Sequence, residues 1–249
     1  MNIPRGQSGP LRARVAELLR TEGFAARLSE WTQFPPRRVI SPLLSFLYST
    51  DEEVKWRAVT AVGIVVAEMA DQDMEAARTI MRRLIWSLND ESGGIGWGAT
   101  EAMGEIMARH EQLAEEFHRI LISYIRDDGN RLEHELLECG VLWGLGRLAQ
   151  VRSDLLKDSV RHILPYLQSQ NPTQRGLAAW TLGFVEVSLP LEPLAHLLQD
   201  QNETIIFEQG SLHRYRISDL ATRLLRGETR GHGDREMGRW GDEAGRAVK

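Results

Sequence analysis

The stretch Val141-Leu142-Trp143-Gly144-Leu145-Gly146 decides the fold, because three other parts of the chain repeat its pattern. The copies are Ala58-Val59-Thr60-Ala61-Val62-Gly63, Ala99-Thr100-Glu101-Ala102-Met103-Gly104 and Ala178-Ala179-Trp180-Thr181-Leu182-Gly183. Each copy has a small or β-branched residue, two variable positions, a small residue, a large apolar residue and a glycine. The glycines recur at spacings of 41, 42 and 37 residues. A period near 40 residues is typical of proteins built from stacked helix pairs.

Each copy of the pattern lies in the second of two segments whose apolar residues have helical spacing. The expected pairs are 39–47 with 54–69, 73–88 with 95–109, 113–126 with 132–149, and 154–168 with 171–187. Ser41-Pro42, Asp51 and Asn171-Pro172 are typical of helix starts. One helix pair cannot bury its apolar face alone, so we expect neighbouring pairs to stack. Small residues and glycines at fixed positions let the stacked helices approach closely.

The N-terminal part of the chain, residues 1–38, differs from the repeats. It predicts two short capping helices, at 11–20 and 24–31, which Pro35-Pro36 separates from the repeat array.

The repeat array extends over residues 39–226 and changes character near its end. After a short helix at 191–198, two β-prone runs, 204–207 and 212–216, flank a glycine turn and predict a hairpin. We expect the hairpin to lead into a last helix, 218–225, and to cover the end of the stack. Residues 227–249 contain six glycines and few large apolar side chains, which predicts a disordered tail.

The Ala-x-x-small-large-Gly helices resemble the HEAT-like repeats called PBS-lyase repeats, over roughly residues 39–225. The stretch Leu88–Gly98 also resembles a segment of uncharacterised bacterial HEAT-repeat proteins. The resemblance implies an all-α, right-handed superhelix of about five helix pairs, an armadillo-like solenoid with a small β-hairpin near its C-terminus. It also implies a binding platform in most such proteins and cofactor handling in a few, because this fold serves many functions.

Composition excludes several classes of function. The net charge of −5 argues against general binding of nucleic acid, which needs a basic surface. No run approaches the ~18 apolar residues of a membrane-spanning helix, and Met1–Pro10 lacks the apolar core of a signal peptide, so we expect a cytoplasmic protein without a membrane partner. Cys139 is the only cysteine, so no disulfide forms within the chain, and we expect an inert, packed thiol.

The second helices of the middle repeats carry acidic and aromatic side chains. A solenoid commonly lines its concave surface with these helices, so we expect an acidic, tryptophan-bearing concave face that binds a protein with a basic or cationic surface. The candidate partner-binding residues are Trp97, Glu101, Glu105, His134, Glu135, Glu138 and Trp143, with Glu133 beside them. Two other interpretations stay open. Tryptophans 56, 86, 143 and 180 fill gaps between helices, or the glutamates form an ordinary solvated face.

Two motifs raise the question of a bound cofactor or metal. Gly94-x-Gly96-x-x-Ala99 matches a dinucleotide fingerprint, but that fingerprint requires a preceding strand and here a helical segment precedes it. A glycine turn before a helix can instead hold an anion or simply allow close packing. His134 and Glu138 lie four residues apart on one helix face and could reach a metal. The comparison with deoxyhypusine hydroxylase, a di-iron HEAT-repeat enzyme, is weak, because that family uses four His-Glu pairs and this chain has one.

The sequence therefore predicts a non-enzymatic protein-interaction scaffold that uses the concave face of a solenoid. It assigns no catalytic residue, cofactor or metal. Two alternatives remain from the family resemblance: a cofactor-handling or lyase-like protein, and a structural subunit of a larger complex.

Overall fold

The computed structural model describes residues 8–88, 96–187 and 192–228. The prediction of an all-α solenoid with one hairpin is confirmed by the order of its elements. Two short helices precede the repeats: α1 (Ser8–Arg20) and the 3₁₀ helix η1 (Phe24–Gln33). Three regular pairs follow, namely α2 (Pro36–Phe46) with α3 (Glu52–Gln72), α4 (Met74–Leu88) with α5 (Ala99–Arg109), and α6 (Glu111–Ser123) with α7 (Glu135–Arg152).

The last two pairs are less regular. The first helix of the fourth pair is broken into η2 (Ser153–Ser159), α8 (Val160–Ile163) and η3 (Leu164–Gln168), and its partner is α9 (Pro172–Gly183). The fifth pair consists of α10 (Glu192–Ala195) with η4 (Leu197–Gln199), and α11 (Ile217–Arg226). Strands β1 (Glu203–Glu208) and β2 (Ser211–Arg216) lie between the two members of this pair in the sequence.

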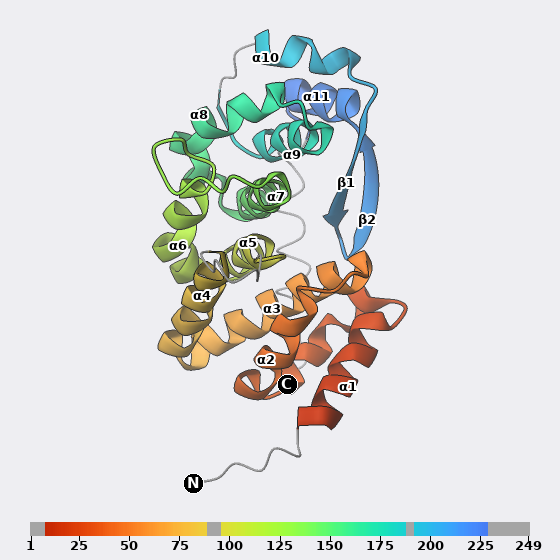
Figure 1. The fold of residues 1–249 in the computed structure, drawn as a ribbon, viewed down its shortest axis with the longest axis vertical. Coiled ribbons are helices and arrows are strands. Elements are labelled where there is room, and N and C mark those ends of the chain that lie inside the picture. Colours follow the sequence, from red (N-terminus) through yellow and green to blue (C-terminus); the bar gives the residue numbers. More distant parts are fainter. Residues whose placement is uncertain (1–7, 89–95, 188–191, 229–249) are drawn as a thin grey trace.

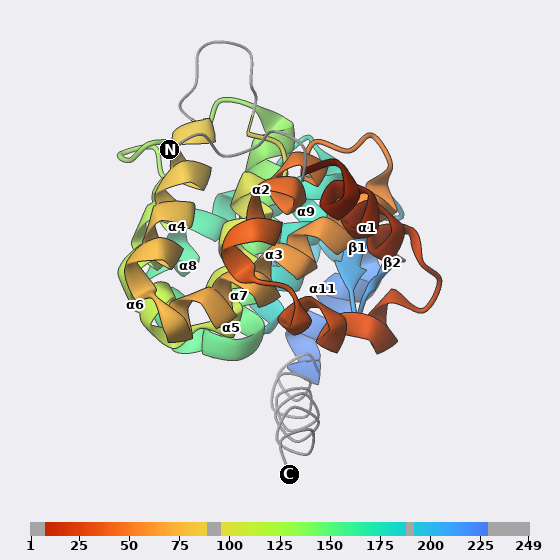
Figure 2. The same ribbon diagram turned by 90° about the horizontal axis from the view of Figure 1, so that it is seen from below.

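The pairs stack into layers. Figures 1 and 2 show α4, α6 and α8 along one side, α3, α5, α7 and α9 in the middle, and the hairpin on the opposite side of the middle helices. We call α3, α5, α7 and α9 the inner layer. Apolar side chains from Val15 to Leu224 form one continuous core through these layers. The role of residues 1–38 as a cap stays a prediction, and the expected tail after 228 and the turn residues 89–95 lie outside the described residues.

Several expected helix bounds differ from the structure by three residues or more, and three of the differences have a local reason. The helix expected to open at Ser41-Pro42 begins at Pro36, so Pro42 lies inside α2. The helix expected from Ile95 begins at Ala99, because Gly98 before it has a left-handed backbone (φ 72°). The continuous helix expected over 154–168 is divided into 3₁₀ and α segments, and Pro165, at the junction of α8 and η3, has no N–H to donate to an α-helical ladder. The expected caps at Asp51 and Asn171 are confirmed, with both side chains accepting backbone N–H bonds.

The repeated glycines let the inner helices touch. A Cβ atom on Gly104 of α5 would overlap the Cα atom of Gly144 on α7, and one on Gly146 of α7 would overlap the Trp180 ring on α9. Glycine inside a helix costs about 1 kcal/mol relative to alanine. Packing between successive second helices offsets this cost, as the sequence pattern predicted.

The hairpin takes its register from its turn. Gln209 (φ 51°) and Gly210 (φ 81°) both have positive φ, which is the type I′ turn whose twist matches two antiparallel strands. Glu208 then pairs with Ser211, and Glu203 pairs with Arg216 at the open end. The expectation that the hairpin covers the end of the stack is wrong. It runs beside the inner layer instead, and Gly210 at its tip approaches Ala25 of η1 (Figure 1).

Replacing Gly104 with alanine tests the close approach of α5 and α7. The new Cβ would meet backbone atoms, which cannot move aside as a flexible side chain can, so we expect a net loss of about 1–2 kcal/mol in the free energy of unfolding despite the gain in helix propensity. Urea denaturation measures it. Gly9→Ala in α1 is the matched control, because no atom of another part of the chain lies within 4 Å of its Cβ position. Equal stability of both variants would contradict the packing.

Candidate interaction surface

Glu105 lies at the centre of a buried charge cluster between α5 and α7. Its Oε1 accepts a hydrogen bond from Arg109 Nε at 2.6 Å, and its Oε2 accepts one from Arg147 Nε on α7 at 2.7 Å. Burial pushes the pKa of the Glu105 carboxyl upward, but the two guanidinium groups outweigh this effect and hold the pKa below its ordinary value of 4.5. Glu105 is therefore a charged bridge between two repeats.

Two other glutamates make similar bridges along the inner layer. Glu101 of α5 pairs with Lys55 of α3 at 3.3 Å and accepts a bond from Thr100. Glu138 of α7 accepts hydrogen bonds from Arg131 (3.0 Å), Tyr166 (2.9 Å) and Gln174 of α9 (2.8 Å). Each interface between successive inner helices thus contains a carboxylate whose oxygens are bonded within the molecule.

The expected solvated acidic face is wrong for these three glutamates. Only 4%, 3% and 6% of Glu101, Glu105 and Glu138 is exposed. They lie on the faces that the stacked helices turn toward each other, where an unpaired charge would be costly and a paired one is tolerated. A partner cannot reach them in this structure.

The tryptophans of the inner layer pack against one another and against the hairpin. Trp56 and Trp143 have ring centroids 4.6 Å apart, and Trp143 stacks with Trp180 at 6.5 Å. Phe207 of β1 stacks on Trp56 at 5.4 Å, and its carbonyl oxygen accepts a hydrogen bond from Trp143 Nε1 at 3.1 Å.

Glu208 completes the contact between the hairpin and the inner layer. Its Oε1 accepts a hydrogen bond from Trp180 Nε1 at 3.0 Å, and its Oε2 accepts one from Tyr215 Oη at 2.7 Å. Trp56, Trp143 and Trp180 are all buried, so the gap-filling interpretation is confirmed for them. The expected open concave face is wrong, because the hairpin covers these side chains.

The candidates that are exposed or half-buried, Trp97, His134 and Glu135, lie at the turns before the second helices α5 and α7. His134 precedes α7, and its ring meets the Trp97 ring edge-on at 5.9 Å. Gly98 packs on Leu47 at the end of α2, and Gly96 packs on Leu88 at the end of α4, so these turns adjoin. We call this surface the loop edge and define it by these residues: Tyr48, Trp86, Trp97, Glu133, His134, Glu135 and Leu136.

The loop edge combines large apolar side chains with acidic ones. Trp86 is 78% exposed, and Leu136 and Tyr48 are about half exposed. The gap-filling interpretation is wrong for Trp86. Its position could have shown this, because the apolar stripe of α4 runs through Ala77, Ile80, Met81 and Leu84, and Trp86 falls off it. Glu133 and Glu135 are exposed, and neither forms an ion pair with a described residue. The partner-binding role of Trp97, His134 and Glu135 stays a prediction.

Cys139 and Glu138, the candidates for a reactive thiol and a metal ligand, are buried between the packed helices. Burial and neighbouring glutamates raise the pKa of the Cys139 thiol to about 12, so it is inert at neutral pH. Glu138, the expected metal partner of His134, has both carboxylate oxygens bonded as described above. No group of three or more His, Cys, Asp or Glu side chains that could hold a metal occurs in the part of the chain that the structure describes. No described helix is long and apolar enough to cross a membrane.

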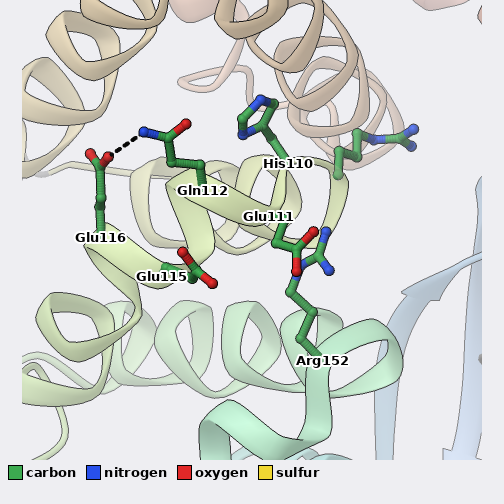
Figure 3. Close-up of a pocket in the computed structure, with 7 residues that line it drawn as sticks. His110, Glu111, Gln112, Glu115, Glu116 and Arg152 are labelled. Atoms are coloured by element: carbon green, nitrogen blue, oxygen red, sulfur yellow. Dashed lines mark hydrogen bonds between the residues drawn. The ribbon is translucent and has the colours of Figure 1, made fainter.

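An open cleft of about 700 Å³ lies where α6 begins and α7 ends (Figure 3). His110 accepts the backbone N–H of Leu113 at 3.4 Å and thereby caps α6, and Gln112 donates to Glu116 at 3.1 Å. Arg152 donates to the Met107 carbonyl at 3.3 Å. The cleft is lined by side chains of both signs of charge, so it selects no class of ligand.

Comparison with known proteins agrees with the geometry. The family model described as HEAT-like repeat matches residues 140–185, which run from α7 to the end of α9. An uncharacterised protein of Archaeoglobus fulgidus is 30% identical over 123 residues. That match covers 49% of this chain and 61% of the relative, less than two thirds of the relative's length.

Two solved structures share the fold. One is an engineered protein, with a TM-score of 0.50 and 16% identity over 88% of this chain and 96% of its own. The other is a computationally designed armadillo repeat protein for modular peptide recognition, with a TM-score of 0.50 and 16% identity over 87% of this chain and 91% of its own. The chain therefore contains a HEAT-like repeat and has an armadillo/HEAT-type fold, as the sequence predicted.

Replacing Glu105 with glutamine tests the buried bridge. The change leaves Arg109 and Arg147 without their charged partner, so we expect a loss of about 3 kcal/mol in the free energy of unfolding at pH 7. Because the pKa of Glu105 is lowered by folding, its contribution is present above about pH 4.5 and is lost as the pH falls through the folded-state pKa. Wild-type stability should therefore fall more steeply below pH 4.5 than that of the variant, in urea titrations at several pH values.

Glu115→Gln is the control for this experiment, since Glu115 is exposed on α6. Its stability should stay within about 0.5 kcal/mol of wild type. If Glu105→Gln behaves in the same way, the bridge does not stabilise the stack.

Proposed function

We propose that this chain is a protein-interaction scaffold and that its partner binds the loop edge. The observation that supports the proposal is Trp86, a tryptophan that is 78% exposed near the end of α4, together with the exposed Glu133 and Glu135 of the loop edge. Tryptophan is enriched among the residues that contribute most to binding at protein interfaces. A large exposed aromatic side chain on a folded surface often marks such a site.

The charge of the loop edge supports a basic or cationic partner. Glu133 and Glu135 project there, and Trp97 and Trp86 offer ring faces that attract lysine or arginine side chains. Complementary charge raises the rate of encounter and disfavours acidic partners. The loop edge thus takes the place of the concave surface expected from the sequence, because the hairpin covers the tryptophans of the inner layer.

The designed armadillo repeat protein of similar fold recognises peptides. For this chain, the analogy supports protein binding in general and names no partner. The alternatives of a cofactor-handling protein and of a structural subunit rest on the family resemblance alone.

Substitutions at the loop edge test the proposal. The triple variant Trp86→Ala, Glu133→Gln and Glu135→Gln removes an exposed ring and two unpaired charges, so the free energy of unfolding should stay within about 1 kcal/mol of wild type. Quantitative mass spectrometry compares the proteins captured by tagged wild type and variant from extracts of the source organism. We expect the variant to recover the partner at least about tenfold less well.

The control variant carries Glu75→Gln and Glu111→Gln, which remove two exposed charges from α4 and α6 away from the loop edge. It should capture the partner as wild type does. A partner recovered equally by wild type and the loop-edge variant would place the interface elsewhere. A difference of a few hundred daltons in the native mass of the chain would favour the cofactor alternative.

A further inference from the structure

Strand β2 is an open edge of the two-stranded sheet. The sheet contains only β1 and β2 within the described chain, and all six residues of β2 are exposed or half-buried. In Figure 1, β1 lies toward the inner layer and β2 lies on the outer side. Edge strands carry a row of free backbone groups and are ready templates for pairing with another strand.

The register identifies which backbone groups face outward. Ile217 N donates to Asn202 O at 3.0 Å, so residues 202 and 217 form a hydrogen-bonded pair. Hydrogen-bonded pairs alternate along an antiparallel ladder, so Ser211, His213 and Tyr215 bond to β1. The N–H and C=O groups of Leu212, Arg214 and Arg216 therefore point away from β1.

The two edges of the hairpin differ in what covers them. On β1 the corresponding outward carbonyl, that of Phe207, accepts the hydrogen bond from Trp143. No other element of the described chain pairs with β2. At least one outward group of β1 is therefore bonded to the inner layer.

The side chains on this edge are basic. Arg214 and Arg216 lie on the same face as Glu203 and Ile205, which are their cross-strand neighbours. Glu203 pairs with Arg214 at 3.0 Å, so an acidic residue on an adjacent strand already meets this arginine. Arg216 is exposed and forms no ion pair with a described residue.

We propose that β2 binds an extended acidic segment of another protein as a third strand. Acidic side chains at alternate positions of that segment would lie opposite Arg214 and Arg216, and its backbone would pair with the outward groups of Leu212, Arg214 and Arg216. A second copy of this chain is a poor occupant, because two-fold pairing centred on Arg214 would place that arginine opposite itself. This surface is separate from the loop edge, and its test does not depend on the partner proposed there.

The probe is a ten-residue peptide of alternating threonine and glutamate, titrated into the full chain by isothermal calorimetry. We expect saturable binding that weakens at least about fivefold in the variant Arg214→Thr with Arg216→Thr, which keeps strand propensity and removes both charges. A variant with Arg20→Gln and Arg119→Gln, which removes two exposed arginines elsewhere, should bind as wild type does.

Amide hydrogen exchange distinguishes strand pairing from simple charge attraction. Bound peptide should slow exchange at Leu212, Arg214 and Arg216, whereas Ser211, His213 and Tyr215 are already protected by β1 in the free chain. The same threonine–glutamate peptide with each glutamate N-methylated has the same charge, and it cannot donate the backbone hydrogen bonds that would pair with Leu212, Arg214 and Arg216. Equal affinity for both peptides, unchanged exchange at the three outward amides, or no binding to the wild type would each overturn the proposal.

Discussion

The contact between the backbones of α5 and α7 at Gly104 and Gly144 is the constraint on which the rest of the structure depends. It brings two second helices so close that no side chain fits between them at that point. Gly63 and Gly146 face side chains of the next inner helix, those of Glu105 and Trp180 respectively. Once these helices touch, their other residues at the contact, polar ones included, are removed from water, and every charged group among them needs a partner inside the molecule.

That requirement explains the buried glutamates. Glu101, Glu105 and Glu138 each connect an inner helix to its neighbour through a charged or polar partner. Breaking such a bridge leaves a charge buried without its partner. A shift of one helix relative to the next would break the bridge and would therefore carry the same cost in free energy. We infer that the glutamates fix the register of the repeats, while the glycines and apolar residues supply the close packing.

The sequence predicted the repeat, the helix pairs and the hairpin, because these depend on local spacing and on turn residues such as Gly210. It could not predict burial at Glu101 or Glu105, since helical spacing shows which residues share a face and does not show what packs on that face. It did not predict the path of the hairpin, which depends on contacts of Phe207 and Glu208 with tryptophans 28 to 151 residues away in the chain. The exposure of Trp86 could have been predicted from the sequence, because this residue lies outside the apolar stripe of its helix.

The hairpin closes the inner layer and leaves the loop edge as the open aromatic surface. Hydroxyl-radical footprinting with mass spectrometry tests it most directly, because oxidation of a tryptophan follows the exposure of its ring. We expect rapid oxidation of Trp86 and strong protection of Trp56, Trp143 and Trp180. Oxidation of those three at rates close to that of Trp86 would show that the inner face is open and that the hairpin does not cover it.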